Sequence, residues 1–147
     1  MNQMYARSAL QEYQQVSRKA GVEDASPHRL IQMLMEGALE KIAAAKGFMA
    51  RGSIQEKGAH ISWAVSIIDG LRVSLDKSVG GEIAENLEEL YIYMMRRLTE
   101  ANLKNEPAYL DEVASLLGQI KSAWDAIAPE AARMEEEKQH AAIPQGR

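Results

Sequence analysis

The sequence predicts an all-α protein, an antiparallel up-down-up-down four-helix bundle with a short N-terminal helix or lid. Residues that favour helix, such as Ala, Leu, Glu, Lys, Met and Gln, are frequent, whereas only 4 of the 147 residues are proline. Apolar residues recur at helical spacing in four long segments, and the glycine and proline signals fall between these segments. The intervening turns are only a few residues long, so neighbouring helices should run antiparallel.

The first long helix is expected to begin at Ser26 and to run to about Ala50. Ser26 is a typical N-cap residue, and Pro27 suits the first helical position because that position needs no hydrogen-bonding N–H. Gly52 is the stop signal, since glycine readily adopts the left-handed conformation that ends many helices.

The second helix is expected to begin after Ser53 and to run to about Lys77. Ser53 and Glu56 have the spacing of a capping box, in which the two side chains bond to each other's backbone N–H groups. The next turn is predicted at Gly80-Gly81, the only double glycine in the chain.

The third and fourth helices are separated by a second polar break. The third helix is expected to run from about Glu82 to Leu103. Asn105 and Pro107 then mark a turn, with proline near the start of a fourth helix that runs to about Ala128.

The chain therefore divides into three parts. Residues 26–128 form the predicted bundle, and residues 1–25 form an N-terminal segment. Residues 129–147 form a predicted flexible tail, because they begin with proline, carry an acidic run and contain Pro and Gly near the end.

The N-terminal segment carries a short apolar face. Tyr5, Ala9, Tyr13 and Val16 are spaced four, four and three residues apart, so they share one side of a short helix. The segment is too weakly apolar to hold a helix alone, and it could dock reversibly on the bundle as a lid. A permanently packed extra helix and a disordered arm are equally open alternatives.

The first bundle helix has more apolar residues than one buried stripe requires. They cover an arc of roughly 240°, against the ~100° stripe of a surface helix. Either part of this helix faces a partner, or the helix is more central than its neighbours, or the chain dimerises. The apolar residues are Leu30, Ile31, Met33, Leu34, Met35, Ala38, Leu39, Ile42, Phe48 and Met49.

The other three helices have clearer core stripes, with a few apolar residues outside them. The predicted stripes are Ile61, Ala64, Val65, Ile68, Leu71 and Leu75; Ile83, Leu87, Leu90, Met94 and Leu98, with Tyr91 and Met95 beside them; and Leu110, Val113, Leu116, Leu117, Ile120, Trp124 and Ile127. Outside the stripes lie Trp63, Ile67, Val73, Ile92 and Tyr93.

Composition argues against several classes of function. The chain has no cysteine, so disulfides and thiolate metal sites are excluded. A net charge of −4 does not favour nucleic-acid binding, and no apolar run approaches the ~20 residues of a membrane span. The N-terminus lacks the pattern of a signal peptide, so we expect a cytoplasmic protein.

No catalytic, metal or cofactor motif is found in the sequence. The three histidines, His28, His60 and His140, lie in different segments. We therefore expect neither an enzyme nor a cofactor.

Four motifs together resemble the FliS family of flagellin export chaperones. They are SPHRLIQMLMEGAL (26–39), GLRVSLD (70–76), NLEELYIYMMRRLTEANLKNE (86–106) and VASLLGQIKSAWDAI (113–127). Their order and spacing make a specific signal, and the resemblance covers nearly everything up to residue 128. One departure is Met35-Glu36, where the family often has an aromatic residue followed by Asp.

The resemblance implies a cytoplasmic chaperone that binds the disordered C-terminal segment of flagellin, prevents its premature polymerisation and delivers it to the flagellar type III export gate. It also implies a movable N-terminal segment with an important tyrosine, for which Tyr13 is the best match. Together with the apolar residues counted on each helix face, the resemblance gives a set of client-binding candidates. They are Tyr5, Tyr13, Leu30, Ile31, Leu34, Met35, Leu39, Ile67, Leu71, Leu87, Tyr91, Met94, Met95 and Asn102.

An alternative of another class stays open, a structural or regulatory helical bundle that self-associates through the same apolar surface. In either case a homodimer could form when no client is bound. Neither nucleic acid nor membrane insertion is expected.

Overall fold

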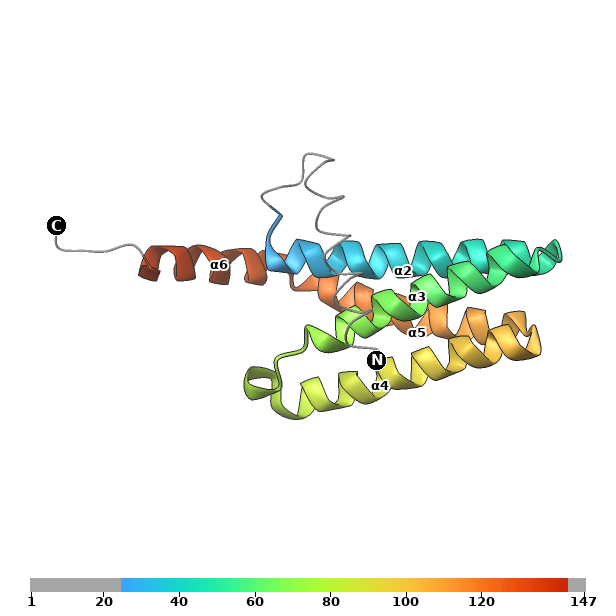
Figure 1. Ribbon diagram of the computed structural model, residues 1–147. Helices are drawn as coiled ribbons and strands as arrows, with labels where there is room; N and C mark the ends of the chain where they lie inside the picture. The colour runs from blue at the N-terminus through green and yellow to red at the C-terminus, as the bar shows by residue number, and fades with distance from the viewer. Residues whose placement is uncertain (1–24, 143–147) are drawn as a thin grey trace.

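The computed structural model describes residues 25–142 of the chain, and this part is all-α, as predicted (Figure 1). Its helices are α2 (Pro27–Ala50), α3 (Ile54–Val73), α4 (Lys77–Lys104), α5 (Pro107–Ala126) and α6 (Ala128–Ala142). The predicted N-terminal lid, with Tyr5 and Tyr13, lies outside the described residues.

Helices α2 to α5 form the predicted antiparallel bundle. Each packs against the next one in the sequence, and α5 packs back against α2, which closes the ring (Figure 1). Within the described residues, no Cα atoms of the diagonal pairs α2 with α4 and α3 with α5 lie within 8 Å of each other. This is the arrangement that short turns between consecutive helices favour.

The start and end of α2 agree with the sequence prediction. The Ser26 Oγ accepts a hydrogen bond from the Arg29 N–H at 3.1 Å, and Pro27 occupies the first helical position. The turn after α2 contains Gly52 with φ 74°, a left-handed conformation that glycine adopts at little cost.

The predicted capping box at the start of α3 is wrong. Ser53 precedes the helix, but its side chain makes no capping hydrogen bond, and its backbone ψ of 83° is well short of the extended value seen at Ser26. Helix α3 also ends at Val73, earlier than the predicted Lys77. Asp76 instead caps the next helix, because its side chain accepts a hydrogen bond from the Ser78 N–H at 3.0 Å.

Helix α4 begins before the predicted break and contains it. Gly81 has φ 54° and ψ −125°, so the chain kinks there between a first turn that begins at Lys77 and the straight remainder of the helix. The straight part thus starts where the third helix was predicted. Asn105, with φ 53°, ends α4 in the left-handed conformation.

The region after α5 differs from the predicted irregular tail. Helix α6 continues almost directly from α5, and Pro129 is compatible with it because the first helical turn does not use that N–H. The helix projects beyond the bundle (Figure 1) and contacts only α2 and α5 among the described helices. None of its described side chains is buried, so it contributes little to the core.

The core explains most of the apolar surplus of α2. Because α2 contacts both α3 and α5, side chains on two of its sides are buried, including Leu34, Met35, Ala38 and Ile42. The interpretation that this helix is simply more central therefore accounts for most of its wide apolar arc.

Three core predictions were wrong, and one of them is Ile127, which was placed in the core stripe of the fourth helix but is 43% exposed just after the end of α5. Ile67 was predicted to lie outside the core but is 1% exposed, because α3 packs against both α2 and α4 and its buried arc is wide. Ile83 was predicted in the core but is 72% exposed, since it lies just after the Gly81 kink at the end of the bundle.

Candidate binding surface

Half of the candidate site residues that the structure describes belong to the core. They are 3% exposed or less, so in this conformation they shape the bundle and offer no surface to a partner: Leu34, Met35, Ile67, Leu71, Tyr91 and Met94. The other six are partly exposed: Leu30, Ile31, Leu39, Leu87, Met95 and Asn102.

A groove between α3 and α4 brings two of the exposed candidates together. Met95 and Asn102 lie on its α4 side, and the volume of the groove is about 310 Å³. Spacings of three and four residues along each helix place its lining in rows. The lining residues are Ile61, Ser62, Val65, Ser66, Asp69, Met95, Thr99 and Asn102.

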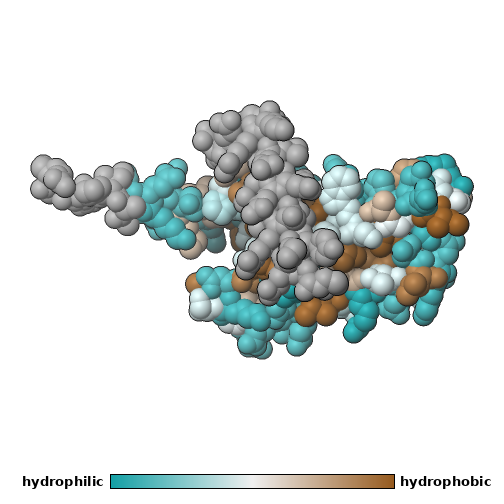
Figure 2. Space-filling model, in the orientation of Figure 1, coloured by the Kyte–Doolittle hydropathy of each residue, from teal (hydrophilic) through white to brown (hydrophobic). Residues whose placement is uncertain are grey.

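The face drawn in Figure 2 is mixed in character. Hydrophobic residues are visible beside the grey atoms, whereas the lower edge, where α4 lies, and α6 are mainly hydrophilic. Large apolar side chains that are at least 70% exposed among the described residues are Ile54, Val79, Ile83 and Leu103. These residues lie singly near helix ends, and isolated exposed apolar side chains of this kind do not by themselves indicate a partner site.

Asp69 is a buried carboxylate in the groove, and sequence reasoning missed it. Its side chain is only 3% exposed. Oδ1 accepts a hydrogen bond from the Arg72 Nε at 2.7 Å, but Oδ2 is buried without any hydrogen-bond donor. The signal was present in the sequence, because Asp69 directly follows Ile67 and Ile68 in a strongly apolar part of α3.

A chain of ion pairs extends from Asp69 to the start of α4. Arg72 also contacts Glu88 at 3.4 Å, and Glu88 pairs with Lys77 at 2.6 Å. The hydrogen bond from Arg72 to Asp69 raises the pKa of Arg72, and the hydrogen bond from Lys77 lowers the pKa of Glu88. These four residues hold the ends of α3 and α4 together and balance two negative charges with two positive ones.

The far end of the groove is fixed by a buried lysine. Lys57, 6% exposed, donates from Nζ to the Asn102 carbonyl oxygen at 3.2 Å and to the Asn105 Oδ1 at 3.1 Å. Those acceptors lie at the C-terminal end of α4, where unpaired carbonyls and the helix dipole favour a cation. Lys57 therefore sets the position of Asn102 relative to α3.

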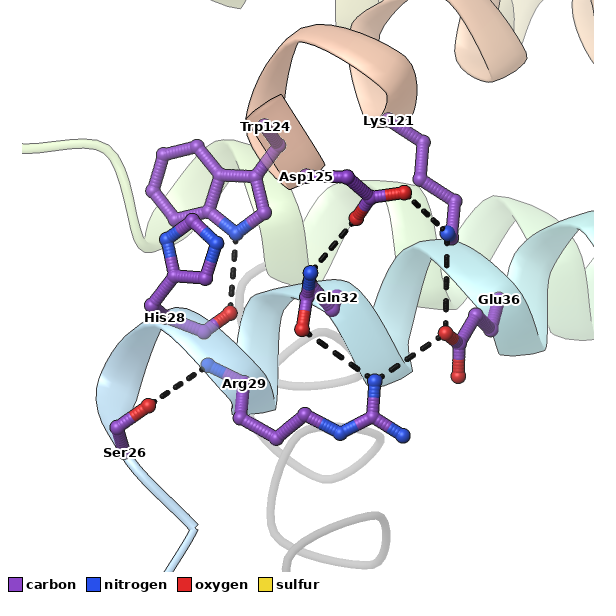
Figure 3. A network of polar contacts seen from close by, with 8 residues as sticks. All are labelled: Ser26, His28, Arg29, Gln32, Glu36, Lys121, Trp124 and Asp125. Carbon is purple, nitrogen blue, oxygen red and sulfur yellow. Dashed lines mark hydrogen bonds and ion pairs between the residues drawn. The ribbon is translucent and has the colours of Figure 1, made fainter. Parts of the chain in front are cut away.

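A stacked pair of rings joins the start of α2 to the end of α5 (Figure 3). The ring centroids of His28 and Trp124 are 4.4 Å apart with the planes 7° from parallel, and the indole Nε1 donates to the His28 carbonyl oxygen at 2.9 Å. Both imidazole nitrogens are buried, and the Trp124 backbone acts on the ring as a weak hydrogen-bonding partner. Burial lowers the pKa of His28, and the nearby Asp125 charge opposes part of that effect.

Polar side chains continue this contact along α2 and α5 (Figure 3). Gln32 donates to the Asp125 Oδ1 at 2.7 Å, and Lys121 pairs with the Asp125 Oδ2 at 2.7 Å. Arg29 and Lys121 both contact Glu36, at 3.2 and 3.8 Å. The narrow polar side of α2 thus partly faces α5, which sequence periodicity alone did not indicate.

The structure offers no metal-binding cluster of three or more His, Cys, Asp or Glu residues within the part it describes. None of the described helices has the length and apolar character needed to cross a membrane. The fold and the site define the class: a four-helix bundle with a partly apolar groove between α3 and α4.

Comparison with known proteins identifies the family. The sequence model described as Flagellar protein FliS matches residues 9–131. The chain is 56% identical over 124 residues to the Flagellar secretion chaperone FliSB of Pseudomonas aeruginosa, covering 84% of this chain and 98% of the relative. It is 47% identical over 133 residues to the Flagellar secretion chaperone FliS of Salmonella typhimurium, covering 90% and 98%. The chain belongs to the FliS family, which confirms the resemblance that its motifs indicated.

A more distant relative supports the same assignment. The chain is 32% identical over 112 residues to the Flagellar secretion chaperone FliS of Bacillus subtilis, covering 76% of this chain and 80% of that protein.

Proposed function

We propose that this protein is an export chaperone that binds the disordered C-terminal segment of flagellin in the cytoplasm, prevents its premature polymerisation and delivers it to the flagellar type III export apparatus. The observation that carries the proposal is the 56% identity to a flagellar secretion chaperone over nearly the whole of that relative. Such a protein needs no catalytic group.

The physical properties of the bundle suit this function. A disordered client loses conformational entropy when it becomes ordered, so binding must bury a large apolar surface to be favourable. The groove beside Met95 and the exposed apolar residues of α4 would contribute part of this surface, and binding driven by burial requires no ATP. A client helix can lie in a groove of this kind with apolar side chains at every third or fourth position.

The N-terminal segment is part of the proposal, although it lies outside the described residues. Its tyrosines, Tyr5 and Tyr13, contribute to the client surface or to a lid over it. Replacing Tyr13 with Ala is expected to change the affinity for the flagellin segment more than the thermal stability of the bundle. An equal loss of stability would make Tyr13 an ordinary packing residue.

A direct binding experiment tests the main proposal. A synthetic peptide of the C-terminal segment of flagellin is titrated into the full-length protein by isothermal titration calorimetry, with a scrambled peptide as control. We expect one peptide bound per chain, with micromolar or tighter affinity. Sedimentation of the same samples reports the oligomeric state. A stable homodimer that does not bind the peptide would instead support the alternative of a self-associating helical bundle.

Delivery needs a separate test. A pull-down with the cytoplasmic part of the export gate, with and without the flagellin peptide, asks whether the loaded chaperone is recognised. Failure of this contact with intact peptide binding would limit the function to holding flagellin.

A further inference from the structure

We infer that Asp69 is a specificity residue of the α3–α4 groove, where its Oδ2 accepts a hydrogen bond from a side-chain amide, asparagine or glutamine, of the bound client segment. The inference deepens the proposed function and rests on it. It assigns a ligand chemistry to one position of the groove.

The geometry of Asp69 is the first step. Its side chain is 3% exposed and lines the groove, its Oδ1 is held by Arg72, and its Oδ2 has no donor. A buried acceptor without a donor is unfavourable, and native proteins retain few of them. Because Oδ2 is buried in the described conformation, a client donor reaches it only when the groove lining moves aside, and the new hydrogen bond would then remove that cost.

The charges around Asp69 select the kind of donor. Arg72 already contacts the carboxylate at 2.7 Å, and the extended cluster with Glu88 and Lys77 contains two acids and two bases. A lysine or arginine of the client would bring an unbalanced positive charge into a largely desolvated position. A neutral donor satisfies Oδ2 without that penalty.

The rest of the lining selects an amide among neutral donors. Ser62, Ser66 and Thr99 carry hydroxyls, and Asn102 carries an amide, so donors and acceptors lie around the same groove. A side-chain amide has two N–H donors and one carbonyl acceptor, and it can use both kinds of partner. The apolar walls formed by Ile61, Val65 and Met95 suit aliphatic residues one helical turn away in the client.

The variant that isolates this contact is Asp69→Asn. It keeps the shape and an oxygen for Arg72, but it places an N–H group where Oδ2 accepts. A hydrogen bond to a charged group is strong enough that its loss should weaken binding of the flagellin peptide by about tenfold or more. Glu88→Gln is the matched control, since it removes one charge from the same ion-pair cluster outside the groove and should change affinity by about twofold or less.

Peptide variants provide a test that does not depend on the stability of the mutant protein. Each asparagine and glutamine of the flagellin peptide is replaced in turn by leucine and titrated against the unmodified chaperone. One replacement should weaken binding by about tenfold. The same replacement should have little further effect with Asp69→Asn, as a double-mutant cycle requires for two groups in contact.

The outcomes separate this inference from the proposed function. If the unmodified chaperone does not bind the flagellin peptide, the proposed function fails. If it binds, but every amide replacement is tolerated, the inference is overturned while the proposed function stands. Equal affinity of a folded Asp69→Asn variant and the unmodified protein would overturn it as well.

Discussion

The Trp124 indole lies flat against the His28 imidazole, with 4.4 Å between ring centroids, and donates a hydrogen bond to the carbonyl oxygen of the same residue. One residue pair thus combines ring stacking with a backbone hydrogen bond across 96 positions of sequence. It joins the first turn of α2 to the last turn of α5, where the bundle closes.

Trp124→Ala is expected to lower the free energy of unfolding by about 3 kcal/mol, because it removes both the stacked surface and the N–H donor. Trp124→Phe keeps a stacked ring and loses only the donor, so it should lower the free energy by about 1 kcal/mol. Urea unfolding followed by circular dichroism measures both. Equal effects of the two variants would mean that the ring contact is unimportant.

The partly buried His28 predicts a pH dependence of stability. Its folded-state pKa lies below the ordinary value of 6.5, so the unfolded chain binds the proton more readily. Stability is therefore full above pH 6.5 and falls as the pH drops through 6.5 toward the lower pKa of the folded state. Urea midpoints between pH 7.5 and 5 measure this decline.

His28→Phe is the control for the pH experiment. Phenylalanine can stack on Trp124 but does not titrate, so the decline between pH 7.5 and 5 should become shallower. An unchanged slope would assign the pH dependence to other groups.

Two glycines should respond in opposite ways to the same substitution. Gly81→Ala is expected to destabilise the protein by about 1–3 kcal/mol, because φ 54° with ψ −125° is strained for any residue with a Cβ. Gly118 lies within α5, and a Cβ there would meet nothing within 4 Å. Gly118→Ala should therefore stabilise the protein by about 0.5–1 kcal/mol. Thermal melts of both variants test the contrast.

The groove itself can be tested at Met95. Met95→Glu should weaken binding of the flagellin peptide by about tenfold or more, because it places a carboxylate in an apolar wall near Asp69. Ile54→Glu is the matched control, since Ile54 is 74% exposed at the start of α3 and does not line the groove. Similar losses for both variants would argue against the α3–α4 groove as the client site.

Much of the fold could be predicted because its determinants are local. Ser26, Pro27, Gly52 and Pro107 act within one turn of the helix ends that they mark, and all lie where predicted. The capping box failed at Ser53 because its hydrogen bond depends on a backbone angle that residue types alone do not determine.

The site was harder to predict because exposure depends on neighbours. Periodicity indicates which residues share a helix face, but not how many helices cover that face. Ile67 was misplaced for this reason, and Leu34 and Met35 lie in the core for the same reason. Asp69 could have been noticed as a lone acid in an apolar run, but its unpaired oxygen depends on packing.

Helix α6 projects from the bundle as an extension of fixed length. Its 15 residues rise about 1.5 Å each, so it spans roughly 22 Å, mostly beyond the end of the bundle. A chain with this outline should diffuse and sediment more slowly than a sphere of the same 16.3 kDa mass. A fluorophore attached near His140 would report rotation of this arm while remaining distant from the α3–α4 groove, which makes α6 a convenient place for a probe.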